Sequence, residues 1–107
     1  MEVKKQDDQN AVVFLGERVN IMNSPELKQK LQALYDEGVQ KITVDFTGTK
    51  MIDSSCLGKL LMFQKRLKDR GGELRISNVT SDYISKMFDI IQLYKVIDIE
   101  THPSDTD

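Results

Sequence analysis

The residues best suited to chemistry are an acid and two hydroxyls that stand together in MIDSSCLGKLL, residues 51–61. Such side chains are favoured helix N-caps, because their oxygen atoms accept hydrogen bonds from the free N–H groups of the first turn. Asp53 or Ser54 can fill this position. A phosphoryl group on Ser54 or Ser55 would lie at the positive end of the same helix dipole, where an anion is stabilised. Local sequence favours the cap and leaves a signalling role open.

The remaining reactive residues form no catalytic or metal-binding pattern. The only histidine, His102, lies in a polar C-terminal tail, away from any partner for a triad or a metal ion. TGT, residues 47–49, lacks the glycine spacing and the lysine of a phosphate-binding loop. Cys56 falls on the apolar side of a predicted helix, where cysteine is usually buried. We therefore predict a protein that is not an enzyme and holds no metal ion and no cofactor.

Composition limits the class of protein and its partners. The 107 residues predict one domain over 1–107, and 39% hydrophobic with 30% charged residues is typical of a globular chain. Fifteen basic against seventeen acidic residues leave a net charge of −2 without a basic stripe, which argues against nucleic acid as a partner. Apolar runs are too short for membrane insertion, and the N-terminus has no signal-peptide core. With a single cysteine, these features predict a cytoplasmic protein.

Strand and helix patterns alternate along a core of about residues 11–99, between a polar N-terminal segment 1–10 and a polar tail 100–107. Strands are predicted at 11–16, 41–46, 73–77 and 94–99, and MEVKK can add a short edge strand. Helices are predicted to begin at Ser24, near Asp53, and at Thr80 or Ser81, with the stretches 16–23 and 47–52 as loops. This order predicts an α/β fold with a mixed sheet of four to five strands covered by amphipathic helices.

Apolar residues at helical spacing define the faces expected to be buried. The second helix carries a broad apolar face formed by Cys56, Leu57, Leu60, Leu61, Phe63 and Leu67. The third helix has a similar face formed by Ile84, Met87, Phe88 and Ile91. Gly58 lies inside the second helix, where it costs about 1 kcal/mol relative to alanine. This cost suggests close packing or the close approach of a partner at Gly58.

Four segments resemble the STAS family, specifically its small anti-sigma factor antagonists. GERVN (16–20) is similar to the family's Gly-Glu segment, and KITVDFTGTKMIDSSCLGKLL (41–61) to its strand followed by Asp-Ser-Ser-Gly-Leu-Gly. KRLKDRGGELRISNV (65–79) resembles the following helix-to-strand turn, and MFDIIQLYKVIDI (87–99) the C-terminal block. The similarity covers nearly all of residues 11–99. It implies a single STAS-like domain.

The resemblance implies a bacterial partner-switching protein in signal transduction and transcription regulation. In the family, a serine kinase that is also an anti-sigma factor phosphorylates the serine after the motif aspartate, and a serine phosphatase removes the phosphate. The matching acceptor is Ser54, with Ser55 as second choice, and the unmodified form binds the kinase. The free protein is expected to be a monomer. The expected partner-binding residues are Asn20, Met51, Asp53, Ser54, Ser55, Cys56 and Lys59.

The chain departs from the family pattern at several positions. Cys56 replaces a glycine in the motif, Gln92 replaces another, and Val19 with Asn20 occupies a segment that often carries an acid. Two other functions stay open: a STAS subunit that docks on a transporter or stress-signalling complex without phosphorylation, and a small-ligand module. Exposed apolar residues in the loops would suit docking, although burial under the sheet edge is the expectation for Ile21, Met22 and Met51.

Overall fold

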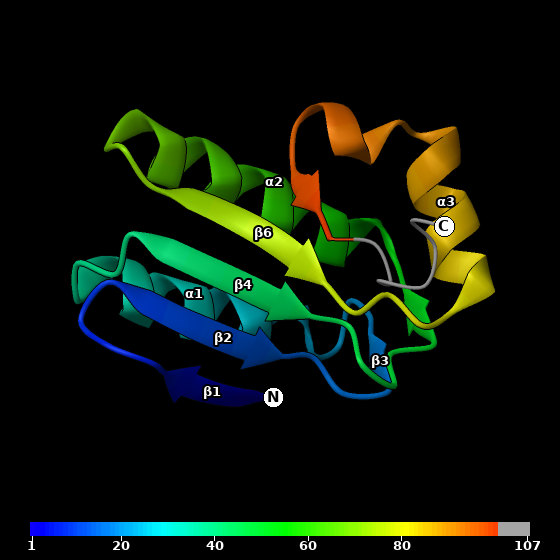
Figure 1. Cartoon of the computed structure of the whole chain (residues 1–107). Helices are drawn as coiled ribbons and strands as arrows, with labels where there is room; N and C mark the ends of the chain where they lie inside the picture. Colours follow the sequence, from blue (N-terminus) through cyan, green and yellow to red (C-terminus); the bar gives the residue numbers. More distant parts are fainter. Residues whose placement is uncertain (101–107) are drawn as a thin grey trace.

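The computed structural model describes residues 1–100, and a five-stranded sheet in the order β1-β2-β4-β6-β7 forms its centre (Figure 1). The strands are β1 (Glu2–Lys5), β2 (Asn10–Phe14), β4 (Lys41–Asp45), β6 (Glu73–Ser77) and β7 (Asp98–Ile99). β1 pairs antiparallel with β2, and the other neighbours pair in parallel. The predicted mixed α/β sheet is confirmed. Apart from Glu100, the expected polar tail with His102 lies outside the described residues.

Three helices accompany the sheet: α1 (Ser24–Asp36), α2 (Ser54–Asp69) and α3 (Asp82–Ile90). Figure 1 shows α1 and α2 side by side behind the central strands, with α3 at one end of the sheet. Alternate strand residues are fully buried on the helix side, namely Ala11, Val13, Ile42, Val44, Leu74 and Ile76. The residues between them, such as Val12 and Thr43, are only half-buried. α1 and α2 therefore cover one face of the sheet rather than both.

The helix boundaries follow the predicted signals with one exception. Ser81 caps α3, because its hydroxyl accepts a hydrogen bond from the N–H of Ile84 at 3.2 Å. Gly38 follows α1 with a φ of +88°, a conformation that glycine adopts without strain. The predicted cap at Ser24 is wrong, since Ser24 is already helical and Asn23 is the N-cap residue. α1 therefore begins at Ser24, one residue earlier than predicted. The side chain of Asn23 does not cap the helix but bonds back to the preceding turn.

The buried face of α2 is rotated slightly from the predicted one. Cys56, Leu60, Phe63 and Leu67 are fully buried as expected, but Leu61 is 41% exposed. Gln64 takes the place on the buried arc that was expected for Leu61. Its amide accepts a hydrogen bond from the N–H of Leu74 at 2.7 Å and donates one to the carbonyl of Val96 at 2.8 Å. A glutamine with both amide atoms satisfied can occupy the core.

The end of the described chain differs from the predicted strand at 94–99. A short 3-10 helix, η1 (Leu93–Lys95), precedes β7, and Gln92 enters it in the left-handed conformation with a φ of +56°. Only Asp98 and Ile99 pair with β6, where an ion pair of 3.1 Å joins Arg75 to Asp98. Ile91, expected on the buried face of α3, is 47% exposed because α3 ends one residue before it.

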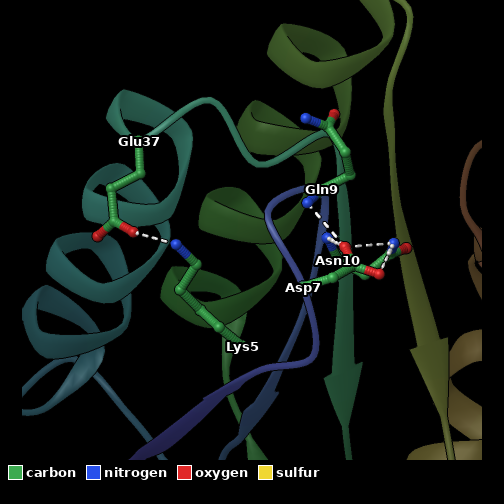
Figure 2. Close-up of polar contacts among 5 residues, drawn as sticks. All are labelled: Lys5, Asp7, Gln9, Asn10 and Glu37. Atoms are coloured by element: carbon green, nitrogen blue, oxygen red, sulfur yellow. Dashed lines mark hydrogen bonds and ion pairs between the residues drawn. The ribbon is translucent and has the colours of Figure 1, made fainter.

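Polar contacts hold the N-terminal hairpin of β1 and β2 (Figure 2). Asp7 accepts hydrogen bonds from the side-chain amide of Asn10 and from the N–H groups of Gln9 and Asn10. These bonds, above all the one from the Asn10 amide, hold the pKa of Asp7 below its ordinary value. The Nζ of Lys5 lies 2.9 Å from Glu37 Oε1 at the end of α1. This exposed pair links β1 to the end of α1, and β1 itself is the predicted edge strand at MEVKK, paired only with β2.

Two stretches predicted as loops contain a second, two-stranded sheet. β3 (Arg18–Val19) and β5 (Met51–Ile52) pair in parallel, with Arg18 opposite Met51 and Val19 opposite Ile52. Figure 1 shows β3 beyond the arrowheads of β2 and β4. Thr49 anchors the loop before β5, since its buried hydroxyl donates to the carbonyl of Gly16 at 2.6 Å. Strands of two residues are too short for an alternating pattern in the sequence.

Candidate functional site

The predicted site lies at the start of α2, next to the ends of β3 and β5. The N–H of Asp53 donates to the carbonyl of Val19 at 3.2 Å, so the end of β5 is joined directly to the end of β3. Parallel strands also end nearby, and the loops at such carboxyl ends commonly form binding sites in α/β proteins. Two segments more than 30 residues apart in sequence thereby form one surface.

Asp53 caps α2, which resolves the choice between Asp53 and Ser54. Its backbone is extended, and its Oδ1 accepts hydrogen bonds from the N–H of Ser55 at 2.9 Å, from the N–H of Cys56 at 3.4 Å and from the Ser55 hydroxyl. Oδ2 accepts from the N–H of Ile21 at 3.0 Å. These bonds, above all the one from the Ser55 side chain, hold the pKa of Asp53 below its ordinary value. Asp53 is therefore an anion at neutral pH.

The two serines of the motif have different environments. Ser54 is the first residue of α2 and is exposed, whereas Ser55 is half-buried and its hydroxyl donates to Asp53. In the part of the chain that the structure describes, the Asp53 carboxylate accepts hydrogen bonds from Ser55, Cys56 and Ile21 but not from Ser54. The Ser54 hydroxyl is thus the more accessible nucleophile of the pair.

A turn at residues 20–23 flanks the motif. The side-chain oxygen of Asn20 accepts from the N–H of Met22 at 2.9 Å, and that of Asn23 accepts from the N–H of Asn20 at 2.7 Å. Asn20, a predicted partner-binding residue, is half-buried and shapes this turn. It also lines a groove of about 210 Å³ together with residues of β3 and β5 and with Asp53.

Three apolar side chains beside the motif are exposed, contrary to the expected burial under the sheet edge. Ile21 is 73% exposed, Met22 85% and Met51 52%. Ile21 and Met22 lie in the hydrogen-bonded turn at 20–23, and Met51 lies on the outward side of β5, where Ile52 takes the buried position. We call Ile21, Met22 and Met51 the apolar rim. In the sequence, the apolar rim was visible only as apolar residues within predicted loops. The β3–β5 pairing that brings these residues together has no recognisable sequence pattern.

The other predicted partner-binding residues lie on the first turns of α2. Lys59 is half-buried and Cys56 is fully buried, so the bulk that replaces the family's glycine points into the core. Gly58 is exposed, and no atom lies within 4 Å of the position that a Cβ would take there. Close packing within the described residues therefore does not account for a glycine at this position.

Burial makes Cys56 unreactive. Removal from water raises the pKa of its thiol to about 12, with a smaller contribution from the Asp53 carboxylate. Because the thiolate is the reacting form, we expect iodoacetamide at pH 8 to alkylate the native protein at least about 100-fold more slowly than the unfolded protein. Rapid labelling of the native protein would contradict this.

The raised pKa of Cys56 also makes stability depend on pH. The unfolded chain binds fewer protons than the native protein from pH 9.0 upward, so the free energy of unfolding falls as the pH rises toward 12.

Comparison with known proteins identifies the family. The profile of the family described as "Mlab, STAS domain" matches residues 3–99. The chain belongs to the STAS domain family. Among curated proteins, the Anti-sigma-B factor antagonist of Bacillus subtilis is 28% identical over 95 residues, which are 89% of this chain and 85% of that STAS protein. The Listeria monocytogenes protein of the same name is 25% identical over 94% of this chain and 87% of its own.

Solved STAS structures share the fold. The anti-sigma factor antagonist SpoIIAA in its unphosphorylated form matches with a TM-score of 0.74 at 17% identity, covering 98% of this chain and 91% of that one. The phosphorylated form of SpoIIAA from Bacillus matches with a TM-score of 0.73 at 20% identity, covering 99% and 96%. The predicted STAS fold and the similarity to anti-sigma factor antagonists are confirmed. Within residues 1–100, no helix combines the length and hydropathy that crossing a bilayer requires.

Proposed function

We propose that this STAS protein is a partner switch that is phosphorylated on Ser54. In the unmodified state it binds a serine kinase or anti-sigma-type regulator, and a serine phosphatase restores that state. The observation that carries the proposal is the exposed Ser54 at the start of α2, next to Asp53, whose Oδ2 accepts the N–H of Ile21 in the apolar rim. The names of the relatives support it, since the curated proteins are antagonists of an anti-sigma factor and SpoIIAA has a phosphorylated form.

Geometry favours Ser54 over Ser55 as the acceptor. Phosphoryl transfer requires a hydroxyl that a kinase can reach and deprotonate. The Ser55 hydroxyl already donates to Asp53 and is half-buried, so its modification would break the cap of α2. A phosphoryl group on Ser54 would instead project from the helix start, where the dipole and free N–H groups stabilise it.

The added charge supplies the switching mechanism. A phosphoserine carries a charge of about −1.5 to −2 at neutral pH. On Ser54 it would stand next to Asp53, which is already an anion and whose Oδ2 accepts the N–H of Ile21 in the apolar rim. A partner that buries the apolar rim would have to strip water from this dianion, and desolvation of a charge without a paired cation disfavours binding. Phosphorylation would therefore release the partner without unfolding the domain.

Gly58 supports a partner surface on the same side of α2. It lies four residues after Ser54, so the two positions are neighbours along one face of the helix. An exposed glycine inside a helix costs about 1 kcal/mol relative to alanine. No atom from another part of the described chain lies near the position that a Cβ would take at Gly58. The close approach of a partner backbone to α2 would explain why a glycine stands there.

Phosphosite mapping tests the proposal. Purified wild-type protein, incubated with ATP and an extract of its source cells, is expected to carry phosphate on Ser54 by tandem mass spectrometry. The variant S54A is expected to lose this modification, and the matched variant S55A to keep it. Phosphate mainly on Ser55 would contradict the assignment. Absence of phosphate together with a stably co-purifying complex would favour the docking STAS subunit without phosphorylation.

A further inference from the structure

Asp53 uses its two carboxylate oxygens for two different tasks. Oδ1 caps α2 through the N–H groups of Ser55 and Cys56. Oδ2 accepts the N–H of Ile21, a residue 32 positions earlier in the chain, at 3.0 Å. A single rigid carboxylate therefore links the start of α2 to the turn that carries two of the three apolar rim residues.

The turn at 20–23 has little else to hold it against α2. Its apolar side chains, Ile21 and Met22, are 73% and 85% exposed and so contribute little burial. Its other hydrogen bonds connect residues within the segment 18–26, as from Met22 to Asn20 and from Asn23 to the carbonyl of Arg18. These bonds shape the turn but do not fix it to the helix. The bond from Ile21 to Asp53 does.

We propose that Asp53 is the positioning residue of the switch, a clasp that holds the 20–23 turn against α2 and that a phosphoryl group on Ser54 opens. This inference rests on the proposed modification of Ser54. It adds that the modification acts on the position of Ile21 and Met22 as well as on the charge of the surface.

Competition for donors opens the clasp. A phosphoryl group on Ser54 lies beside the N–H groups of Ser55 and Cys56, and its oxygens are stronger acceptors than a carboxylate because they carry more charge. Its negative charge also repels the carboxylate of Asp53, the residue directly before it. As Asp53 turns away from the helix start, Oδ2 leaves the N–H of Ile21. The turn is then held only through its two ends, where the carbonyl of Val19 accepts the N–H of Asp53 and where α1 begins.

Hydrogen exchange on a protein with phosphoserine placed at position 54 by genetic code expansion tests the clasp without any kinase. The amide of Ile21 is expected to exchange at least about tenfold faster than in the unmodified protein, because a hydrogen bond to a charged acceptor is lost. Amides of Val13 and Ile42 in the central strands are expected to keep their protection, which shows that the domain stays folded. Phosphoserine at the exposed Ser85 on α3 is the matched control and is expected to leave Ile21 unchanged.

Hydrogen exchange on the variant D53N is the second test of the clasp. Asparagine keeps one oxygen to cap α2, but its NH₂ group cannot accept the N–H of Ile21. Ile21 is therefore expected to exchange at least about tenfold faster in D53N, with the first turn of α2 still protected. Wild-type protection of Ile21 in D53N, or in the folded protein with phosphoserine 54, would overturn the clasp. Since no kinase is used, failure of Ser54 to be modified in cells would leave these results unchanged and would count only against the proposed function.

Discussion

Aspartate at position 54 is expected to weaken binding of the kinase or anti-sigma-type partner by about 100-fold, because a charge that must be desolvated at an interface costs several kcal/mol. The variant S54A is expected to bind as tightly as the wild type, since it removes only a hydroxyl. Isothermal titration of the wild type, S54A and S54D with the same partner measures the difference. Aspartate carries less charge than phosphate, so the phosphorylated protein is expected to bind more weakly still.

The matched control for S54D is Ser85→Asp. Ser85 is exposed on α3, so this substitution changes the net charge equally on a helix that does not carry the motif. Its affinity for the partner is expected to equal that of the wild type. If S54D and S54A bound the partner with equal affinity, the charge-based switch would be wrong, and this surface would serve only for docking.

Gly72→Ala is expected to lower the free energy of unfolding by about 3 kcal/mol, the upper range for overpacking a site that cannot relax. A Cβ on Gly72 would lie 2.1 Å from the carbonyl oxygen of Gln40 and 2.9 Å from its carbonyl carbon. That carbonyl accepts the N–H of Glu73 at 2.9 Å, so it cannot move without disturbing the start of β6. Denaturant unfolding followed by circular dichroism measures the loss.

Gly58→Ala is the matched control, because it adds the same methyl group at a glycine with open space around it. Removing a glycine from a helix is expected to raise the free energy of unfolding by about 1 kcal/mol. A stability of Gly72→Ala equal to that of the wild type would contradict the close approach of β6 and Gln40. Reduced partner affinity of the more stable Gly58→Ala protein would place Gly58 within the interface.

Long periodic elements could be predicted from the sequence because their patterns repeat. Leu27, Leu31 and Leu34 recur at helical spacing, and the alternation of Ile42, Val44 and Phe46 predicts a strand; all six residues are buried. The pattern was wrong for Leu61, because the glutamine three residues later makes two hydrogen bonds inside the core. Periodicity counts apolar residues and cannot anticipate a buried amide that finds both partners.

The candidate site could be predicted only in part. Asp53 and Ser54 were recognisable as candidate caps because a cap is a local feature of four or five residues, and the choice of Ser54 as acceptor came from the resemblance to the STAS family. The link from Asp53 to Ile21 depends on the pairing of β3 with β5, and neither two-residue strand has a pattern of its own. Ile21 and Met22 are exposed because they lie in the tight turn at 20–23, whereas their apolar character alone favoured burial.

Because β3 and β5 are far apart in sequence, the surface that they form can assemble only after both strands have been synthesised. All of α1 and β4 lies between the two strands, so they meet only after this intervening chain has left the ribosome and packed. Closing such a long loop is entropically costly until tertiary contacts stabilise it. A nascent chain that ends before Met51 presents Ile21 and Met22 without Asp53. A regulator that contacts both segments therefore requires a chain that has been synthesised at least to the start of α2.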